Sequence, residues 1–395
     1  MRKATRSGPL TDDIVVFVAV CVGDGAARRL GRLHRADARR MRVMTVLGAR
    51  PQFIKAAPVS RMLRQGNDQF LVHTGQHYDD AMSDLFFRQL ELPAPDVNLG
   101  VGSGSHGAQT GAMLQGIEAA AVEYGPDWLL VYGDTNSTLA GALVGAKLHI
   151  PVAHVEAGLR SYDRRMPEEV NRVVADHVSA LLLCPTETAV ANLEREGITQ
   201  GVVLVGDVML DAFQQNLALA REQTTILADL GLERGRYQLL TVHRAENVDG
   251  SEHLERILEG VAASERRVVF PVHPRTRAAL TGRGLEAAAN VMIVEPVGYL
   301  EMLVLEENAD AIVTDSGGVQ KEAYFAGRPC ITLRDRTEWT ETVDAGWNVL
   351  VGIDPRAIAE AMRSFRPEGP RPDLFGSGDA APRIVESLRA ATRTT

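Results

Sequence analysis

Short, purely apolar segments alternate with longer amphipathic stretches from Met41 onward, and this pattern restricts the fold more than any other feature. Apolar runs without polar alternation are typical of strands buried on both faces of a parallel sheet. The candidate strands are 42–47, 70–73, 128–132, 152–155, 181–184, 202–205, 239–242, 268–272, 291–294, 311–314, 330–333 and 349–351. Helix-like segments between them include 51–65, 108–124, 137–147, 168–180 and 319–326. Repetition of strand, helix and strand predicts an α/β fold of doubly wound, Rossmann-like sheets.

The candidate strands form two groups, and residues 206–235 lie between them as the expected crossover. We therefore predict one Rossmann-like domain at 41–206, a second at 207–372, and a C-terminal helix and tail at 373–395. Two such sheets facing each other would enclose a central cleft, and α/β folds bind ligands beside the carboxyl ends of their strands.

The composition is that of a soluble globular protein, with 395 residues of which 45% are hydrophobic and 24% charged. The net charge of −9 disfavours a nucleic-acid partner, because phosphate backbones are bound by basic surfaces. Cys21, Cys184 and Cys330 include no CxxC pair, which excludes a disulfide scaffold and a thiolate zinc site. No apolar run reaches the roughly 20 residues of a transmembrane helix. We expect a cytoplasmic protein without a membrane partner.

Residues 1–40 differ from the rest, because they contain nine basic and four acidic residues. Their apolar run at 14–22 is too short to cross a bilayer, and Asp12, Asp13 and Asp24 flank it unfavourably for a signal peptide. We expect a poorly ordered extension, translated from a start upstream of Met41; a targeting segment is the alternative.

The first strand candidate runs into the segment GARPQFIK at 48–55. Gly48 permits a tight turn, and Pro51 suits the first turn of a helix. Arg50 and Lys55 bring two cations to the N-terminus of that helix, which predicts an anion site. The alternative is an ordinary strand–helix turn whose cations point into solvent.

A second pattern, TDSGGVQKE at 314–322, follows another apolar strand. Ser316, Gly317 and Gly318 open a helix, and glycine lets backbone N–H groups approach phosphate oxygens without obstruction by a Cβ. Glu322, about one turn later, is placed to accept hydrogen bonds from ribose hydroxyls. The pattern is neither GxGxxG nor a Walker loop, so it favours a diphosphate–ribose ligand over a dinucleotide or ATP hydrolysis. A plain strand–helix turn is the alternative.

Acidic residues stand at strand ends or loops at three nearby points: Asp134, Glu156 in HVEAGLR at 154–160, and Glu168 in MPEEVNR at 166–172. Carboxylates at adjacent strand ends can converge over one cleft, as general acid–base catalysis requires. Each alone could be a helix cap or a salt-bridge partner. The three together indicate catalysis.

His243 and Arg244 follow another strand candidate, where they could meet a phosphate or a leaving group. His273 and Arg275 form a second, weaker pair, and for each histidine the alternative is to cap a neighbouring helix. The sequence has no D-x-D triad, no HExxH and no paired-histidine spacing. We expect neither a metal ion nor another cofactor.

Seven motifs, in order and at matching spacings, resemble those of the non-hydrolysing UDP-N-acetylglucosamine 2-epimerases. They lie at 48–55, 74–77, 132–138, 154–160, 167–172, 242–247 and 314–322, and the resemblance extends from Met41 to about residue 370. That family has two Rossmann-type domains in a glycosyltransferase-B-like arrangement, binds UDP mainly through the second, and is usually dimeric. The resemblance implies a UDP-sugar substrate and a homodimer.

The resemblance also implies the reaction: UDP leaves C1, a 2-acetamidoglucal forms, and UDP returns after protonation of C2 from the other face. Direct removal of the C2 proton would be very slow, because C2 is not next to a carbonyl. By resemblance, Asp134, Glu156 and Glu168 exchange the proton and His243 assists the diphosphate. The implied substrate- and UDP-binding residues are Arg50, Lys55, Gln76, His77, Arg172, Arg244, Tyr299, Ser316, Gly317, Gly318, Glu322 and Arg334.

The chain departs from the family pattern at two points. Residues 78–80 read YDD where bacterial relatives have a glutamine-rich segment for substrate activation, and Trp339 stands where many relatives have arginine. Segments 48–53 and 334–341 also resemble a sister branch acting on UDP-2,3-diacetamido-2,3-dideoxyglucuronic acid, whose C6 carboxylate Arg164 and Arg165 could meet. A solvated loop is the alternative for these arginines. A glycosyltransferase or a hydrolysing epimerase on the same fold is a more distant alternative.

Overall fold

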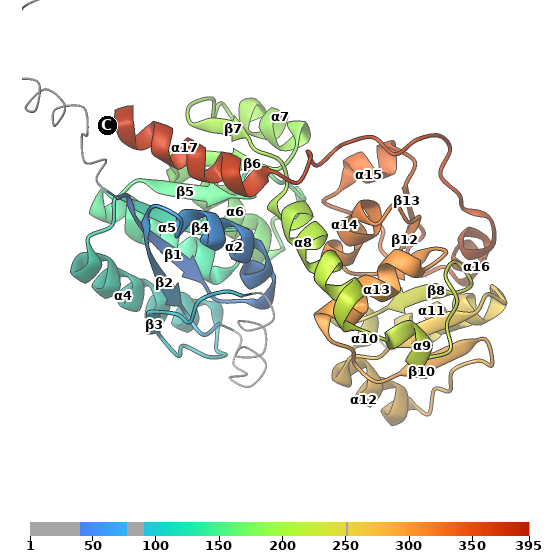
Figure 1. Ribbon diagram of the computed structural model, residues 1–395. Helices are drawn as coiled ribbons and strands as arrows, with labels where there is room; N and C mark the ends of the chain where they lie inside the picture. Colours follow the sequence, from blue (N-terminus) through green and yellow to red (C-terminus); the bar gives the residue numbers. More distant parts are fainter. Residues whose placement is uncertain (1–39, 77–90, 250–251, 395) are drawn as a thin grey trace, which may run out of the picture. The chain divides into compact units, whose positions relative to one another are not determined.

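The computed structural model describes residues 40–76, 91–249 and 252–394, and Met41–Thr395 forms one compact unit (Figure 1). Residues 1–39 of the extension predicted at 1–40, and His77, lie outside the described residues. The described strands form two sheets in which every pair is parallel. The predicted fold class of two doubly wound, Rossmann-like sheets is confirmed.

The first sheet has the strand order β3-β2-β1-β4-β5-β6-β7, so the direction of winding reverses between β1 and β4. Its strands are β1 (Arg42–Leu47), β2 (Asp68–His73), β3 (Val97–Asn98), β4 (Trp128–Tyr132), β5 (Val152–Val155), β6 (Leu181–Cys184) and β7 (Val202–Leu204). Its helices are α2 (Arg50–Leu63), α4 (His106–Tyr124), α5 (Asn136–Leu148), α6 (Pro167–Val178) and α7 (Glu187–Arg195). We call this sheet with its helices the first lobe.

The second sheet has the order β10-β9-β8-β11-β12-β13, with the reversal between β8 and β11. Its strands are β8 (Gln238–Thr241), β9 (Val268–Pro271), β10 (Val291–Val294), β11 (Ile312–Thr314), β12 (Cys330–Thr332) and β13 (Asn348–Leu350). Its helices are α10 (Ala245–Val248), α11 (His253–Ala263), α12 (Pro274–Arg283), α13 (Tyr299–Asn308), α14 (Gly317–Phe325), α15 (Thr340–Asp344) and α16 (Pro355–Ser364). We call this part the second lobe.

Each sheet is buried on both faces, as the uninterrupted apolar runs predicted. Along β4, Leu129 and Val131 pack toward α4 and α5, whereas Trp128, Leu130 and Tyr132 pack toward α2. This alternation with a period of two places every side chain of the strand in an apolar layer.

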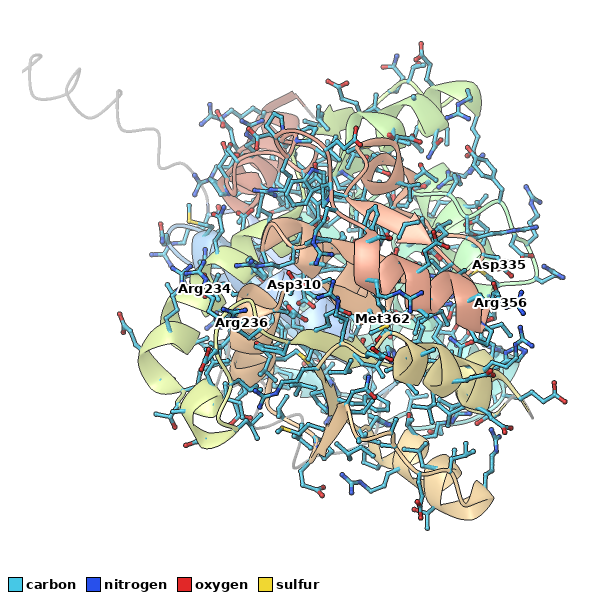
Figure 2. The ribbon with its side chains drawn as sticks, turned by 90° about the vertical axis from the view of Figure 1, so that its right-hand side faces the viewer. Arg234, Arg236, Asp310, Asp335, Arg356 and Met362 are labelled. Carbon is cyan, nitrogen blue, oxygen red and sulfur yellow. The ribbon has the colours of Figure 1, made fainter. Side chains whose placement is uncertain are left out.

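The second sheet shows the same two-sided burial. Residues of β8, β9 and β11 alternate between a layer that includes α8 (Val208–Gln223), α13 and α14 and a layer that includes α11 and α16. Met362 of α16, labelled in Figure 2, is fully buried, and its carbonyl oxygen accepts a hydrogen bond of 2.8 Å from the side chain of Gln238 in β8. The free thiols of Cys184 and Cys330 are buried in β6 and β12.

One helix, α8, connects the cores of the two lobes. After β7 the chain enters α8, which packs against both α2 and α13, and α9 (Ile226–Asp229) follows. One apolar cluster therefore runs from β6 and α7 through α8 to β8 and α14. The last helix, α17 (Ala380–Thr394), returns to α2, where Ile384 and Leu388 join the first lobe's core (Figure 1).

Among the described helices, none is both long enough and apolar enough to span a bilayer.

Candidate active site

A cavity of about 860 Å³ opens at the carboxyl ends of the strands and takes its lining from both lobes. Its position next to the two winding reversals, after β1 and β4 and after β8 and β11, is where doubly wound sheets bind ligands. From the first lobe it is lined by a set that we call the first wall: Lys55, Asp134, Glu156, Glu168 and Arg172. From the second lobe it is lined by a set that we call the second wall: Arg244, Tyr299, Ser316, Gly317, Gly318 and Glu322.

The turn after β1 positions Lys55. The side chain of Gln52 accepts hydrogen bonds from the backbone N–H groups of Gly48 (2.8 Å) and Ala49, and thereby caps α2. A Cβ on Gly48 would lie 2.0 Å from Ser137 Oγ, so glycine is needed here for close packing of α5. Glycine is therefore required at position 48 because the turn after β1 packs closely against α5.

Asp134 follows Gly133, whose φ of +61° favours glycine. The Asp134 carboxylate is about one-third exposed and forms an ion pair with Arg172 of α6. Behind it, the buried ring of His154 is 2.7 Å from the carbonyl oxygen of Gly133 and 2.7 Å from Asp176 Oδ1. Both ring nitrogens of His154 lie within hydrogen-bonding distance of an oxygen, and these two contacts hold the turn that carries Asp134.

Glu156 is buried at the end of β5 and has a φ of +70°, which is costly for a residue with a Cβ. One carboxylate oxygen contacts Lys55, and the other accepts a hydrogen bond of 2.9 Å from Lys321 of α14. Burial by itself raises the pKa of Glu156, but the two ammonium groups outweigh it and the net pKa lies well below the ordinary range. Glu156 is therefore a carboxylate in the unliganded cavity.

Glu168 and Glu169 open α6, and the fold gives them different surroundings. Glu168 is exposed and lines the cavity. Glu169 is buried, accepts hydrogen bonds of 2.9 Å from the backbone of Ser161 and Tyr162, and pairs with Arg172 at 3.1 Å. Glu169 thus anchors a loop, while Glu168 faces the space where a ligand would lie.

The second wall centres on the N-terminus of α14. Ser316 caps this helix, because its hydroxyl accepts a hydrogen bond from the N–H of Val319. Gly317 and Gly318 have no heavy atom closer than 3.7 Å to the position of a Cβ, so their backbone lies open toward the cavity. Free N–H groups at the start of a helix attract anions.

Glu322 faces the cavity one turn further along α14 and accepts a hydrogen bond of 3.3 Å from the hydroxyl of Tyr299. Burial raises its pKa to about 7, against the lowering effects of Tyr299, Lys321 and Glu306. Glu306 of α13 is fully buried beside it, and no donor among the described residues reaches its oxygens. Burial and the Glu322 charge hold the pKa of Glu306 well above its usual value.

His243 lies at the edge of the site rather than in the lining of the cavity. Its ring is about half exposed, and Nδ1 is 3.3 Å from Asp315, which also accepts hydrogen bonds from the backbone N–H groups of His243 and Arg244. The adjacent Arg244 does line the cavity. His273, by contrast, caps α12 by accepting a hydrogen bond from the N–H of Arg275, so the capping alternative applies to this histidine.

The remaining predicted residues are placed elsewhere or lie outside the side chains that can be described. Gln76 accepts a hydrogen bond of 2.8 Å from the hydroxyl of Ser137, in the packing beneath Gly48. Arg334 pairs with Glu338 at 3.1 Å and lines an adjoining cavity of about 530 Å³. Arg165 lines both cavities and is held by Asp163. Arg50 begins α2, but its side chain is not described.

Sequence reasoning gave no site role to several residues that shape the site. Lys321 and Trp339 line the cavity, and the ammonium of Lys321 lies 4.1 Å from the centre of the Trp339 ring. His154 lies within a quoted motif, and Glu306 in none. Their burial depends on contacts between distant segments, so no local pattern could have identified them.

The fold and the two walls define a class of protein: a two-lobed α/β protein in which an open helix N-terminus, a feature that can attract an anionic group, faces several carboxylates across one cavity. Among the described residues, no group of three or more His, Cys, Asp or Glu side chains is arranged to hold a metal ion. The acid–base groups of such a site are its carboxylates and the cations that contact them.

Comparison with known proteins identifies the family. The family model described as UDP-N-acetylglucosamine 2-epimerase matches residues 61–389. A Methanococcus maripaludis protein named as a UDP-N-acetylglucosamine 2-epimerase homolog is 52% identical over 355 residues, covering 88% of this chain and 99% of its own. The Pseudomonas aeruginosa UDP-2,3-diacetamido-2,3-dideoxy-D-glucuronate 2-epimerase is 47% identical over 358 residues, with coverages of 88% and 99%.

A solved structure agrees with these sequences. The crystal structure of Methanocaldococcus jannaschii UDP-GlcNAc 2-epimerase in complex with UDP-GlcNAc and UDP matches with a TM-score of 0.80 at 46% identity, covering 89% of this chain and 100% of that chain. The chain belongs to the UDP-N-acetylglucosamine 2-epimerase family. It is an isomerase with a glycosyltransferase-B-like pair of lobes, as the seven motifs predicted.

Proposed function

We propose that the protein interconverts UDP-N-acetylglucosamine and UDP-N-acetylmannosamine by elimination and re-addition of UDP. The observation that carries this proposal is the pairing of the two walls: three carboxylates of the first lobe face the open N-terminus of α14 across one cavity. The relatives named above as 2-epimerases support the same reaction class.

The chemistry assigns a task to each wall. In the elimination, the bond from C1 to the diphosphate oxygen breaks and its electron pair leaves with UDP, while a carboxylate takes the C2 proton and a C1–C2 double bond forms. The second wall stabilises the departing diphosphate through helix N–H groups and Arg244, where preorganised donors are most effective. His243, at the edge of the site, and Arg50, at the start of α2, are the further candidates for assisting and binding the diphosphate.

The return step inverts C2. A proton is delivered to the opposite face of C2, and the diphosphate oxygen adds to C1. Two faces require acid–base groups on both sides of the sugar, and Asp134, Glu156 and Glu168 are the candidates. Lys55 contacts Glu156 and Arg172 contacts Asp134, and these contacts orient the two carboxylates. Glu322 and Tyr299 would hold the ribose, and Gln76, His77 and Arg334 complete the proposed binding set.

A second candidate substrate is UDP-2,3-diacetamido-2,3-dideoxyglucuronic acid. The Pseudomonas aeruginosa relative named for this sugar is 47% identical. Arg165, which lines both cavities, is the residue available to its C6 carboxylate. The reaction would be the same, with a different group at C6.

The test is to supply each UDP-sugar alone in D₂O and to follow the anomeric and C2 protons by NMR. We expect the C2-inverted UDP-sugar to appear with deuterium at C2, and the faster of the two substrates identifies the preferred sugar. Stoichiometric accumulation of free UDP in the phosphorus spectrum would instead show a hydrolysing epimerase. Turnover that begins only when a sugar acceptor is added would show a glycosyltransferase.

A further inference from the structure

Lys321 is the most completely buried cation that faces the cavity. It lies on α14 with only 2% of its surface exposed, five residues after Ser316. A buried ammonium is stable only when its hydrogen atoms meet acceptors. Two other segments of the chain provide acceptors for Lys321, and a third covers its ammonium with an aromatic ring.

Two carboxylates accept hydrogen bonds from Lys321. Glu156 Oε1, at the end of β5 in the first lobe, is 2.9 Å from its Nζ, and Asp207 Oδ2, at the N-terminus of α8, is 2.7 Å away. The indole ring of Trp339 covers the same ammonium at 4.1 Å, and Trp339 is itself buried. An aromatic face attracts a cation without accepting its proton.

Lys321 therefore completes a chain of charges across the lobes. Glu156 is held at one oxygen by Lys55 of α2 and at the other by Lys321 of α14, so its carboxylate cannot rotate without breaking one of the two contacts. The backbone at Glu156 has a φ of +70°, a conformation that is unfavourable for a residue with a Cβ. A carboxylate fixed from both lobes next to a strained backbone position indicates a demand for exact placement.

We infer that Lys321 is a positioning residue for the epimerisation, which holds Glu156 ionised and oriented toward the sugar from the opposite lobe. This inference rests on the proposed function and adds a residue to it. Glu156 is the group that meets the substrate, and Lys321 acts through it.

Several ionisable groups surround the ion pair of Lys321 and Glu156. Lys55 faces Glu156 from α2, Asp207 faces Lys321 from the start of α8, and the charge of Lys321 also acts on Glu322 of α14 and Glu341 of α15. The cations that contact Glu156 directly are Lys55 and Lys321. Removal of Lys321 leaves one cation in contact with a buried carboxylate, and the pKa of Glu156 must then rise.

The test combines Lys321→Met with Asp207→Asn, because this pair of changes removes one buried positive and one buried negative charge together. Asp207→Asn alone is the matched control, since it disturbs the same cluster but leaves the contact between Lys321 and Glu156. Three quantities are measured: kcat against pH, KM, and the dissociation constant of UDP by calorimetry. Wild-type turnover of either UDP-sugar is established first.

In the double variant we expect kcat at pH 7 to fall by about tenfold or more, and the acid limb of the kcat profile to move upward by about one pH unit or more. The dissociation constant of UDP should stay within about twofold of the wild-type value, because Lys321 acts on Glu156 rather than on the second wall's helix terminus. The control should keep the wild-type position of the acid limb. If the double variant fails to fold, Lys321→Gln, which keeps a donor but no charge, should show the same shift of the limb.

An unmoved acid limb in an active double variant, or a loss of UDP affinity in proportion to kcat, overturns the inference and leaves the proposed function standing. A wild-type chain that turns over neither sugar overturns the proposed function, and with it the role of Lys321, before any variant is made.

Discussion

The two walls of the cavity differ in how their charged groups are paired within the protein. On the first wall, Asp134 is paired with Arg172 and Glu156 with two lysines, so the charges of these two carboxylates are balanced within the protein. On the second wall, α14 presents an open helix terminus. Burial raises the pKa of Glu322 to about 7, and this residue lies beside a second buried carboxyl, that of Glu306. The first wall is complete without substrate, whereas the second is arranged to be completed by one. Under the proposed function, this contrast would separate the groups for proton transfer from those for UDP binding.

Asp134→Asn tests the first wall most directly, and we expect the largest effect from it. The amide cannot exchange the C2 proton, so kcat should fall by about 10³-fold while UDP binding stays nearly intact. Steady-state kinetics and UDP calorimetry measure the two quantities. The control is Asp379→Asn, which changes a carboxylate outside the cavity lining. Normal turnover by Asp134→Asn would remove this residue from the acid–base set.

Gly318→Val tests the second wall. The added side chain would enter open space at the N-terminus of α14, where it obstructs a phosphate without disturbing the core. The dissociation constant of UDP should rise by about 10- to 100-fold, because phosphate contacts to helix N–H groups are lost. Gly282→Val in α12, where an added Cβ would have no neighbour within 4 Å, controls for the cost of valine in a helix. Equal UDP affinity in both variants would place the diphosphate elsewhere.

Gly133→Ala tests whether the first wall is preassembled. Gly133 has a φ of +61°, and an added Cβ would lie 3.2 Å from Glu156 Oε2 and 3.4 Å from Lys55 Nζ. Gly100→Ala is the matched control, because its φ is +57° but nothing lies within 4 Å. Both changes should lower the free energy of unfolding by about 1 kcal/mol. Only Gly133→Ala should lower kcat, by about tenfold, and parallel losses in both variants would contradict a preassembled wall.

Glu322→Gln gives the smallest expected effect, which is a change in the free energy of unfolding. The sign of this change distinguishes the two walls. Since the pKa of Glu322 is raised to about 7, the folded protein holds a proton that the unfolded chain releases, and stability falls as pH rises from about 4.5 to 7. Glutamine does not titrate, so the variant does not lose stability in this pH range. In urea unfolding at pH 8 without ligand, it should be more stable than the wild type by about 1 kcal/mol.

Glu156→Gln should show the opposite sign in the same measurement. The pKa of Glu156 is lowered, so its stabilising contribution is present above the pKa of the unfolded chain and is lost as pH falls. At pH 8 this variant should be less stable than the wild type. Equal behaviour of the two glutamine variants would abolish the distinction between the walls.

The sequence was sufficient for the architecture because burial on both faces of a strand leaves a local signature. Strands β1, β4, β5, β6 and β10 have the predicted bounds. The two-residue strand β3 (Val97–Asn98) was not predicted, because two residues carry no pattern. The motifs at strand ends likewise located the walls, since the topology gathers the carboxyl ends of parallel strands at one edge.

The sequence was insufficient wherever a role depends on a partner from another segment. Glu168 and Glu169 are neighbours with the same chemistry, and only the loop around Ser161 decides which of them faces the cavity. Lys321 lies in a stretch of α14 where every residue from Gln320 to Phe325 is buried, so helical periodicity could not indicate its direction. Its partners Glu156 and Asp207 lie more than 100 residues away.

The apolar cluster that passes through α8 has a consequence for how such enzymes can be rebuilt. Side chains of β6, α8 and β8 share one interior, and α17 returns from the end of the chain to seal the first lobe. Exchanging one lobe with that of a relative would cut through this common interior. A chimera therefore needs its boundary drawn around α8 and α17 together, and heating the intact protein should melt both halves in a single cooperative step.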